Sequence, residues 1–117
     1  MSIDDLDVSL MRGTLDLLIL KSLSWGSQHG YAIAEWIEAT TGSAVLVGEG
    51  TLYPALHRMA RRGWIESEWG ISENNRKAKF YRLAKAGRRR LEAGTQSWQE
   101  FVRAAGRALT AARAGGG

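Results

Sequence analysis

The sequence contains no cysteine and only one proline among its 117 residues. Without thiols there are no disulfide bonds, no thiolate nucleophiles and no cysteine-ligated zinc, which fits a reducing cytoplasm. Long apolar runs are lacking as well. The longest apolar cluster, residues 15–23, is interrupted by Asp16 and Lys21 and is too short to span a bilayer. We therefore expect a buried core helix there, no membrane partner and a cytoplasmic location.

The sequence also lacks the residue patterns of catalysis and metal binding. Of its two histidines, neither His29 nor His57 has a metal ligand at helical spacing, and no Asp or Glu lies three or four residues from His57. The Gly-Glu-Gly at 48–50 is not followed by the Gly-Lys-Ser/Thr of a phosphate-binding loop. We predict no metal, no cofactor and no enzymatic activity.

What is present is a globular composition with an uneven charge distribution. The chain is 44% hydrophobic and 24% charged, with five tryptophans, enough for one compact domain. Residues 1–40 contain six acidic and two basic residues, whereas residues 58–90 contain eleven Lys or Arg against three Glu. The basic middle of the chain is expected to attract polyanions, nucleic acid first and anionic lipid second.

Apolar periodicity predicts four helices and a hairpin. The first helix, from about Leu10 to Trp25, is apolar nearly all round, so a second subunit or a long C-terminal helix should cover its second side. The next helix begins near Tyr31 and stops at Gly42; the third begins near Gly50 or Thr51, with Thr51 as N-cap and Pro54 in the first turn, and stops at Gly63.

Residues 65–71 and 79–83 alternate as two strands joined by a polar turn, and a last helix begins at Lys85. The order predicts a mainly α fold with a small β-hairpin, a winged helix-turn-helix. We expect a DNA-binding domain at 1–84, a dimerisation helix at 85–113 and a flexible tail at 114–117.

A helical wheel divides the third helix into two faces. Leu52, Ala55, Leu56, Met59 and Ala60 share the core side, whereas Tyr53, Pro54, His57, Arg58 and Arg61 lie opposite, with Arg62 near the boundary. Arginine can read guanine or grip phosphate. A solvated charged face is the alternative for an isolated helix. The adjacent basic wing, with Arg76, Lys77 and Lys79, favours DNA, although charges at a strand edge also prevent strand pairing.

Tryptophans 25, 36, 64 and 69 are expected in the core. Trp98 differs, because the last helix places it on a narrow apolar seam with Phe101. We assign Leu17, Trp98 and Phe101 to a dimer interface, in which two facing indoles could form a slot for a planar aromatic effector. Of these two interpretations, dimer packing is favoured over a ligand slot.

Four segments of the chain resemble the PadR family of bacterial transcriptional regulators. They are HGYAI (29–33), GTLYPALHRM (50–59), GWI (63–65) and KFYRLAKAG (79–87). The resemblance implies a homodimeric winged-helix repressor that binds a palindromic operator in double-stranded DNA and is often released by a small molecule. It places the recognition positions on Thr51, Tyr53, His57 and Arg58, and the basic wing on Arg76, Lys77 and Lys79.

The sequence departs from the family pattern where a threonine would cap the last helix, because Ala84 stands there. Losing that cap costs about 1 kcal/mol of local helix stability. A rival interpretation is a winged-helix module for protein interaction or ligand sensing that has lost DNA binding. That rival predicts a neutral recognition helix and wing, and this chain has neither.

Overall fold

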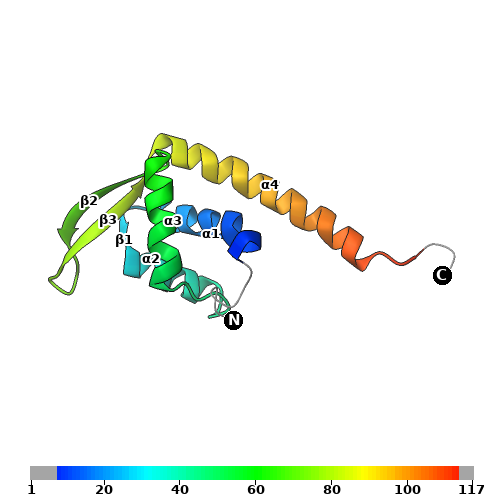
Figure 1. Cartoon of the computed structure of the whole chain (residues 1–117), viewed down its shortest axis with the longest axis horizontal. Helices are drawn as coiled ribbons and strands as arrows, with labels where there is room; N and C mark the ends of the chain where they lie inside the picture. The colour runs from blue at the N-terminus through cyan, green and yellow to red at the C-terminus, as the bar shows by residue number, and fades with distance from the viewer. Residues whose placement is uncertain (1–7, 114–117) are drawn as a thin grey trace.

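The computed structural model describes residues 8–113, with side chains from Gly13 onward. The elements follow in the order α1 (Val8–Ser22), β1 (Gln28–His29), α2 (Gly30–Thr40), α3 (Glu49–Arg61), β2 (Ile65–Ile71), β3 (Lys77–Leu83) and α4 (Lys85–Thr110) (Figure 1). This is the predicted winged helix-turn-helix, mainly α with a small sheet. The expected tail at 114–117 and the side chains of Leu10 and Met11 lie outside the described residues.

The sheet has three antiparallel strands in the order β1-β3-β2, one more than predicted. Gln28 pairs with Tyr81 and His29 with Phe80, whereas β2 and β3 pair along their full lengths from Ile65↔Leu83 to Ile71↔Lys77. A two-residue strand has no alternation to detect, which is why the sequence did not reveal β1. β3 also begins two residues earlier than expected, at Lys77.

The core lies where α1, α2 and α3 meet the base of the sheet. Its buried side chains are Leu15, Ile19, Leu20, Leu23, Ile33, Ile37, Leu52, Ala55, Leu56, Met59, Ile65 and Tyr81. α1 packs against α2 on one side and against α4 on another. We expected either a second subunit or a long C-terminal helix to cover the second side of α1. In the structure the C-terminal helix, α4, packs there.

Gly42 and Gly63 end their helices as predicted. Both adopt positive φ, 61° and 76°, which glycine tolerates without a Cβ clash. The following amides bond back across the last turn, Ser43 to Glu38 at 2.8 Å and Trp64 to Met59 at 3.0 Å. This is the Schellman arrangement, which satisfies carbonyl groups left free at a helix end.

α3 begins at Glu49, close to the predicted start near Gly50 or Thr51, but the predicted N-cap is wrong. Gly48, not Thr51, is the N-cap, and its carbonyl accepts the amides of Thr51 and Leu52 at 3.1 and 2.9 Å. Pro54 is therefore the sixth helical residue rather than a first-turn residue. Gly48 has extended backbone and caps the helix without a side-chain hydrogen bond. Glycine is itself an accepted N-cap, so the helix can begin before Thr51.

α4 begins at Lys85 as predicted, although Ala84 offers no side chain to cap it. The Ala84 amide instead bonds to the Trp64 carbonyl at 3.0 Å, and α4 passes so close that a Cβ on Gly87 would lie 2.0 Å from the same oxygen. From this anchor the 26-residue helix runs along α1 and then continues beyond the rest of the fold (Figure 1).

Two tryptophans are not where the sequence placed them. Trp36 and Trp64 pack against the core, but Trp25 is 68% exposed and Trp69 is 63% exposed. Trp25 follows the end of α1 and rests against Trp36, with ring centroids 5.6 Å apart. Trp69 lies on the outer half of the hairpin, opposite Lys79. The expectation that both belong to the core is therefore wrong.

Candidate nucleic-acid interface

α3 presents two chemically distinct faces, as the helical wheel predicts. Its buried side chains are Leu52, Ala55, Leu56 and Met59, which fasten the helix to the core. Tyr53, Pro54, His57 and Arg61 are exposed on the other face, and Thr51 is half-buried. The exposed face therefore offers an aromatic ring, an imidazole and a guanidinium to a partner.

Arg58 is less available than the sequence suggests. Its guanidinium donates to Asp16 on α1, with Nη2 and Oδ1 2.5 Å apart. The Arg58 side chain is 22% exposed and that of Asp16 is 13% exposed, so the pair is largely withdrawn from water. The contact joins α3 to α1, which also packs against α4. Asp16 is the one acidic residue of the largely apolar α1, and this was the one sequence signal for such a partner.

Tyr53 joins α3 to the start of α2. Its ring lies against Gly30, where an added Cβ would be 2.8 Å from the phenol oxygen. The preceding His29 caps α2, because its Nδ1 accepts the Ala32 amide at 3.3 Å. The Tyr53 ring is thus held in place while remaining 39% exposed.

The wing brings three cations together at the end of the hairpin. Its turn is closed by the Ser72 amide, which donates to the Arg76 carbonyl at 2.8 Å, and by Asn75 at φ 57°. Arg76 and Lys77 are exposed and Lys79 is half-buried. The Nζ atoms of Lys77 and Lys79 lie 5.0 and 5.9 Å from the centre of the Trp69 ring.

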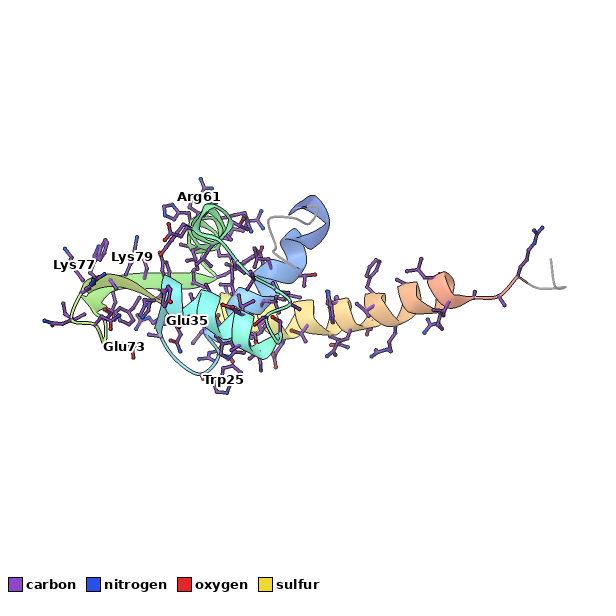
Figure 2. All side chains as sticks on the ribbon, turned by 90° about the horizontal axis from the view of Figure 1, so that it is seen from below. Trp25, Glu35, Arg61, Glu73, Lys77 and Lys79 are labelled. Atoms are coloured by element: carbon purple, nitrogen blue, oxygen red, sulfur yellow. The ribbon has the colours of Figure 1, made fainter. Side chains whose placement is uncertain are left out.

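A groove of about 1070 Å³ separates α3 from the wing. It is lined by Tyr53 and His57 from α3 and by Arg76, Lys77 and Lys79 from the wing, so it brings together five of the eight predicted DNA-contacting residues. Thr51, Arg58 and Arg61 are not on its lining. Arg61 nevertheless points to the same side of the molecule as Lys77 and Lys79, whereas Trp25 lies on the opposite side (Figure 2).

The walls of this groove are not uniformly basic. Glu35 of α2 and Glu73 of the wing turn also line it. Tyr81 lies at the base, where burial, followed by the neighbouring Tyr53, raises the pKa of its phenol. Tyr81 therefore stays neutral near pH 7. Glu73 is 84% exposed, but Figure 2 shows it on the other side of the wing from Lys77 and Lys79, which lie on the side of Arg61.

A second hollow lies between α1 and α4. Leu17 packs directly on α4, where an added Cβ at Gly94 would be 2.6 Å from its methyl group. The Trp98 indole donates from Nε1 to Thr14 Oγ1 at 3.0 Å. Leu17 and Trp98 line both an apolar groove of about 640 Å³ and a smaller hollow of about 410 Å³ that also includes Phe101. The three residues assigned to an interface are thus brought together.

Residues 8–113 show two further negative findings. No cluster of three or more His, Asp or Glu side chains that could hold a metal ion occurs among the described residues. In the same part of the chain, none of the helices has the length and apolar character needed to cross a bilayer.

Comparison with known proteins reveals one family. Residues 19–93 match the transcriptional regulator PadR-like family. A transcriptional regulator from Clostridium thermocellum is similar in structure, with a TM-score of 0.76 and 27% identity over 85% of this chain and 96% of its own. A PadR-like transcriptional regulator from Bacillus cereus has a TM-score of 0.74 and 27% identity, covering 89% of this chain and 99% of its own.

A third similar structure is Bacillus subtilis PadR in complex with operator DNA. Its TM-score is 0.61 at 25% identity, over 68% of this chain and 44% of that one. The matched family region extends from α1 into α4 and so includes α3 and the wing. The chain belongs to the PadR-like family of transcriptional regulators.

Proposed function

We propose that this regulator binds double-stranded DNA as a homodimer and represses transcription from a palindromic operator. The observation that supports this most is the groove in which Tyr53 and His57 of α3 face Arg76, Lys77 and Lys79 of the wing. A helix that fits the major groove, beside cations that reach the flanking phosphates, is the arrangement of winged helix-turn-helix readers. The similar PadR from Bacillus subtilis, seen with operator DNA, supports the same use.

Within this proposal the predicted residues have different tasks. Tyr53, His57 and Arg61 are exposed and contact base edges, with Thr51 at the start of the helix. Arg76, Lys77 and Lys79 contact phosphates. Arg58 reaches DNA only by giving up part of its contact with Asp16, so its main task is to position α3. A protein with this function acts where the chromosome is, in the cytoplasm.

The exposed apolar side chains of α4 support the proposed homodimer. Its outer half exposes Phe101, Val102 and Leu109, at 69%, 43% and 85%, on a helix that extends beyond the core. Large apolar side chains so exposed favour association. A second copy packed against α1 and α4 would cover them. It would also supply a second α3, about 34 Å from the first if the two read successive turns of one duplex.

The α1–α4 groove is the proposed effector site. Its lining is mainly apolar, its volume of about 640 Å³ suits a small molecule, and Trp98 offers a flat aromatic surface. A planar aromatic compound is the chemical class that stacks on such a ring. Binding there would act on DNA through α1, whose Asp16 contacts Arg58 of α3.

A mobility-shift experiment tests the DNA-binding proposal. The DNA upstream of the protein's own gene is titrated with the protein over a series of salt concentrations. We expect a discrete complex whose affinity falls steeply with salt, because each phosphate contact releases condensed counterions. The rival, a winged-helix module without DNA binding, predicts no complex. A promoter–reporter fusion then distinguishes repression from activation, with higher expression expected when the regulator is deleted.

A further inference from the structure

The outer half of the wing exposes two large apolar side chains that do not contribute to the core. Trp69 is 63% exposed and Ile71 is 65% exposed. In the register of the hairpin Trp69 lies opposite Lys79 and Ile71 opposite Lys77, so all four side chains share one face. Exposed apolar residues on an edge strand promote aggregation unless they serve a purpose. The face therefore requires a functional explanation.

The opposite face of the hairpin has different chemistry. It carries Glu66 and Glu68, and Glu66 accepts a hydrogen bond from Arg82 at 2.8 Å. A polyanion is consequently repelled from the glutamate face and attracted to the face of Trp69. The two lysines hold their Nζ atoms 5.0 and 5.9 Å from the Trp69 ring centre, so the indole lies in a positive field.

The Trp69 face is also continuous with the candidate DNA interface. Trp69, Lys77 and Lys79 line the same groove as Tyr53 and His57. Figure 2 shows Lys77 and Lys79 on the same side as Arg61 of α3. A duplex whose major groove receives α3 would therefore bring its neighbouring sugar–phosphate strands to Trp69.

An indole between two cations matches the chemistry of a DNA minor groove. The groove has apolar sugar walls and a phosphate line on each side, and proteins commonly insert apolar side chains into it beside lysine or arginine. A·T-rich segments are favoured, because a narrow groove has enhanced negative potential and lacks the guanine amino group. An anionic membrane surface also collects tryptophan and lysine, but the continuity with α3 favours DNA.

We propose that Trp69 is a DNA-contacting residue that inserts its indole into the minor groove flanking the site read by α3, with Lys77 and Lys79 on the adjacent phosphates. This inference rests on the proposed DNA binding. It makes the wing sensitive to base composition beside the major-groove site, because the indole meets the guanine amino group only where the flanking base pairs are G·C.

The test compares Trp69→Ala with Trp25→Ala on three labelled duplexes, alternating A·T, alternating I·C and alternating G·C, by fluorescence anisotropy at low salt. Trp25 is the matched control, since it is 68% exposed, has Lys21 Nζ 4.7 Å from its ring centre and lies on the opposite side of the molecule. Inosine lacks the minor-groove amino group, so I·C resembles A·T in that groove alone.

We expect Trp69→Ala to weaken binding about tenfold on A·T and I·C and less on G·C, the size of effect seen when a stacked aromatic is removed. Trp25→Ala should bind as wild type. If Trp69→Ala lowers the unfolding midpoint below the assay temperature, Trp69→Thr, which suits a strand but offers no large apolar side chain for insertion, replaces it with the same expectation.

Three results would overturn the inference, and they are distinguishable from one another. Wild-type affinity of the Trp69 variant on all three duplexes would show that the indole does not touch DNA. An equal loss on all three would show a contact without minor-groove preference. If the wild-type protein binds none of them but binds vesicles containing phosphatidylserine, both this inference and the proposed function fail.

Discussion

Arg58 and Arg61 lie about one turn apart on α3 and have different surroundings. Arg61 is exposed on the side of the wing cations, whereas Arg58 is held by Asp16. Arg62, the next residue, turns toward Trp64, with its guanidinium carbon 5.1 Å from the ring centre. The two arginines of α3 and the one that follows it thus differ in which partner each can reach.

Replacing the exposed residues of α3 should weaken DNA binding without unfolding the protein. For Tyr53→Ala and Arg61→Ala we expect losses of about 1 to 3 kcal/mol each in operator binding, measured by titration, because each removes a direct contact. Arg62→Ala removes the same charge beside Arg61 but on a different side of the helix, and it should bind nearly as wild type. Equal affinities for Arg61→Ala and Arg62→Ala would show that the reading face is misassigned.

The Asp16–Arg58 contact should contribute to stability as well as to position. Asp16→Asn and Arg58→Ala are each expected to lower the free energy of unfolding by about 1 to 3 kcal/mol, since each leaves a largely buried polar partner poorly satisfied. Chemical denaturation of both single variants and the double variant measures the coupling between them. Strictly additive losses would mean that the two side chains do not interact.

At the scale of residues, sequence patterns predicted which side chains of a single helix face the core and which face outward. The wheel of α3 separated Leu52, Leu56 and Met59 from Tyr53, His57 and Arg61 correctly, because that separation depends only on helical periodicity. It could not show that Arg58 meets Asp16, which lies 42 positions away in the sequence. The sequence also did not reveal that Trp25 and Trp69 are exposed, because they were assigned to the core from residue type alone.

At the scale of elements, helix ends and strands were predictable where a local signal exists. Gly42 and Gly63 mark their helix ends by the backbone conformation that they allow. β1 was missed because its pairing with β3 joins segments more than 50 positions apart, Gln28 with Tyr81. α3 begins early because Gly48 and the chain before it, rather than a side-chain cap, set its first turn.

The effector proposal concerns two elements, because the groove that would bind the effector lies between α1 and α4. Titrating the DNA-free protein with acridine, a planar aromatic probe, should quench tryptophan emission, and Trp98→Ala should abolish most of that quenching because the ring that stacks is gone. Trp69→Phe, which removes an exposed tryptophan of the wing that does not line this groove, should retain it. Equal quenching of wild type and Trp98→Ala would leave Trp98 as a packing residue only.

At the scale of the whole molecule, α4 makes the chain elongated. The principal extents are 65, 29 and 22 Å, and the long axis follows the part of α4 that leaves the core (Figure 1). Phe101 and Leu109 are exposed on this part of α4, so packing against its own chain stabilises the helix end little. The proposed dimer gives that segment a partner and fixes the spacing of the two α3 helices.

Phe101→Asp should therefore convert the protein to a monomer. A carboxylate at the centre of an apolar interface would be buried without a partner, which opposes association. Light scattering after size-exclusion chromatography measures the mass, expected to fall from that of two chains to that of one. Arg103→Asp changes charge on the same helix but about 200° away, and should leave the dimer intact. A wild-type mass of one chain would contradict the proposed dimer directly.

The most direct test of the central claim is the spacing of the DNA half-sites. Duplexes are selected from a random pool by the wild-type protein, and the selected site is then rebuilt with five base pairs inserted at its centre. Two α3 helices related by a two-fold axis predict an inverted repeat with half-site centres about 10 base pairs apart. The insertion rotates the half-sites to opposite faces of the duplex and should reduce affinity toward the non-specific level. An asymmetric selected site, or undiminished affinity after the insertion, would contradict recognition by two copies of this helix and wing.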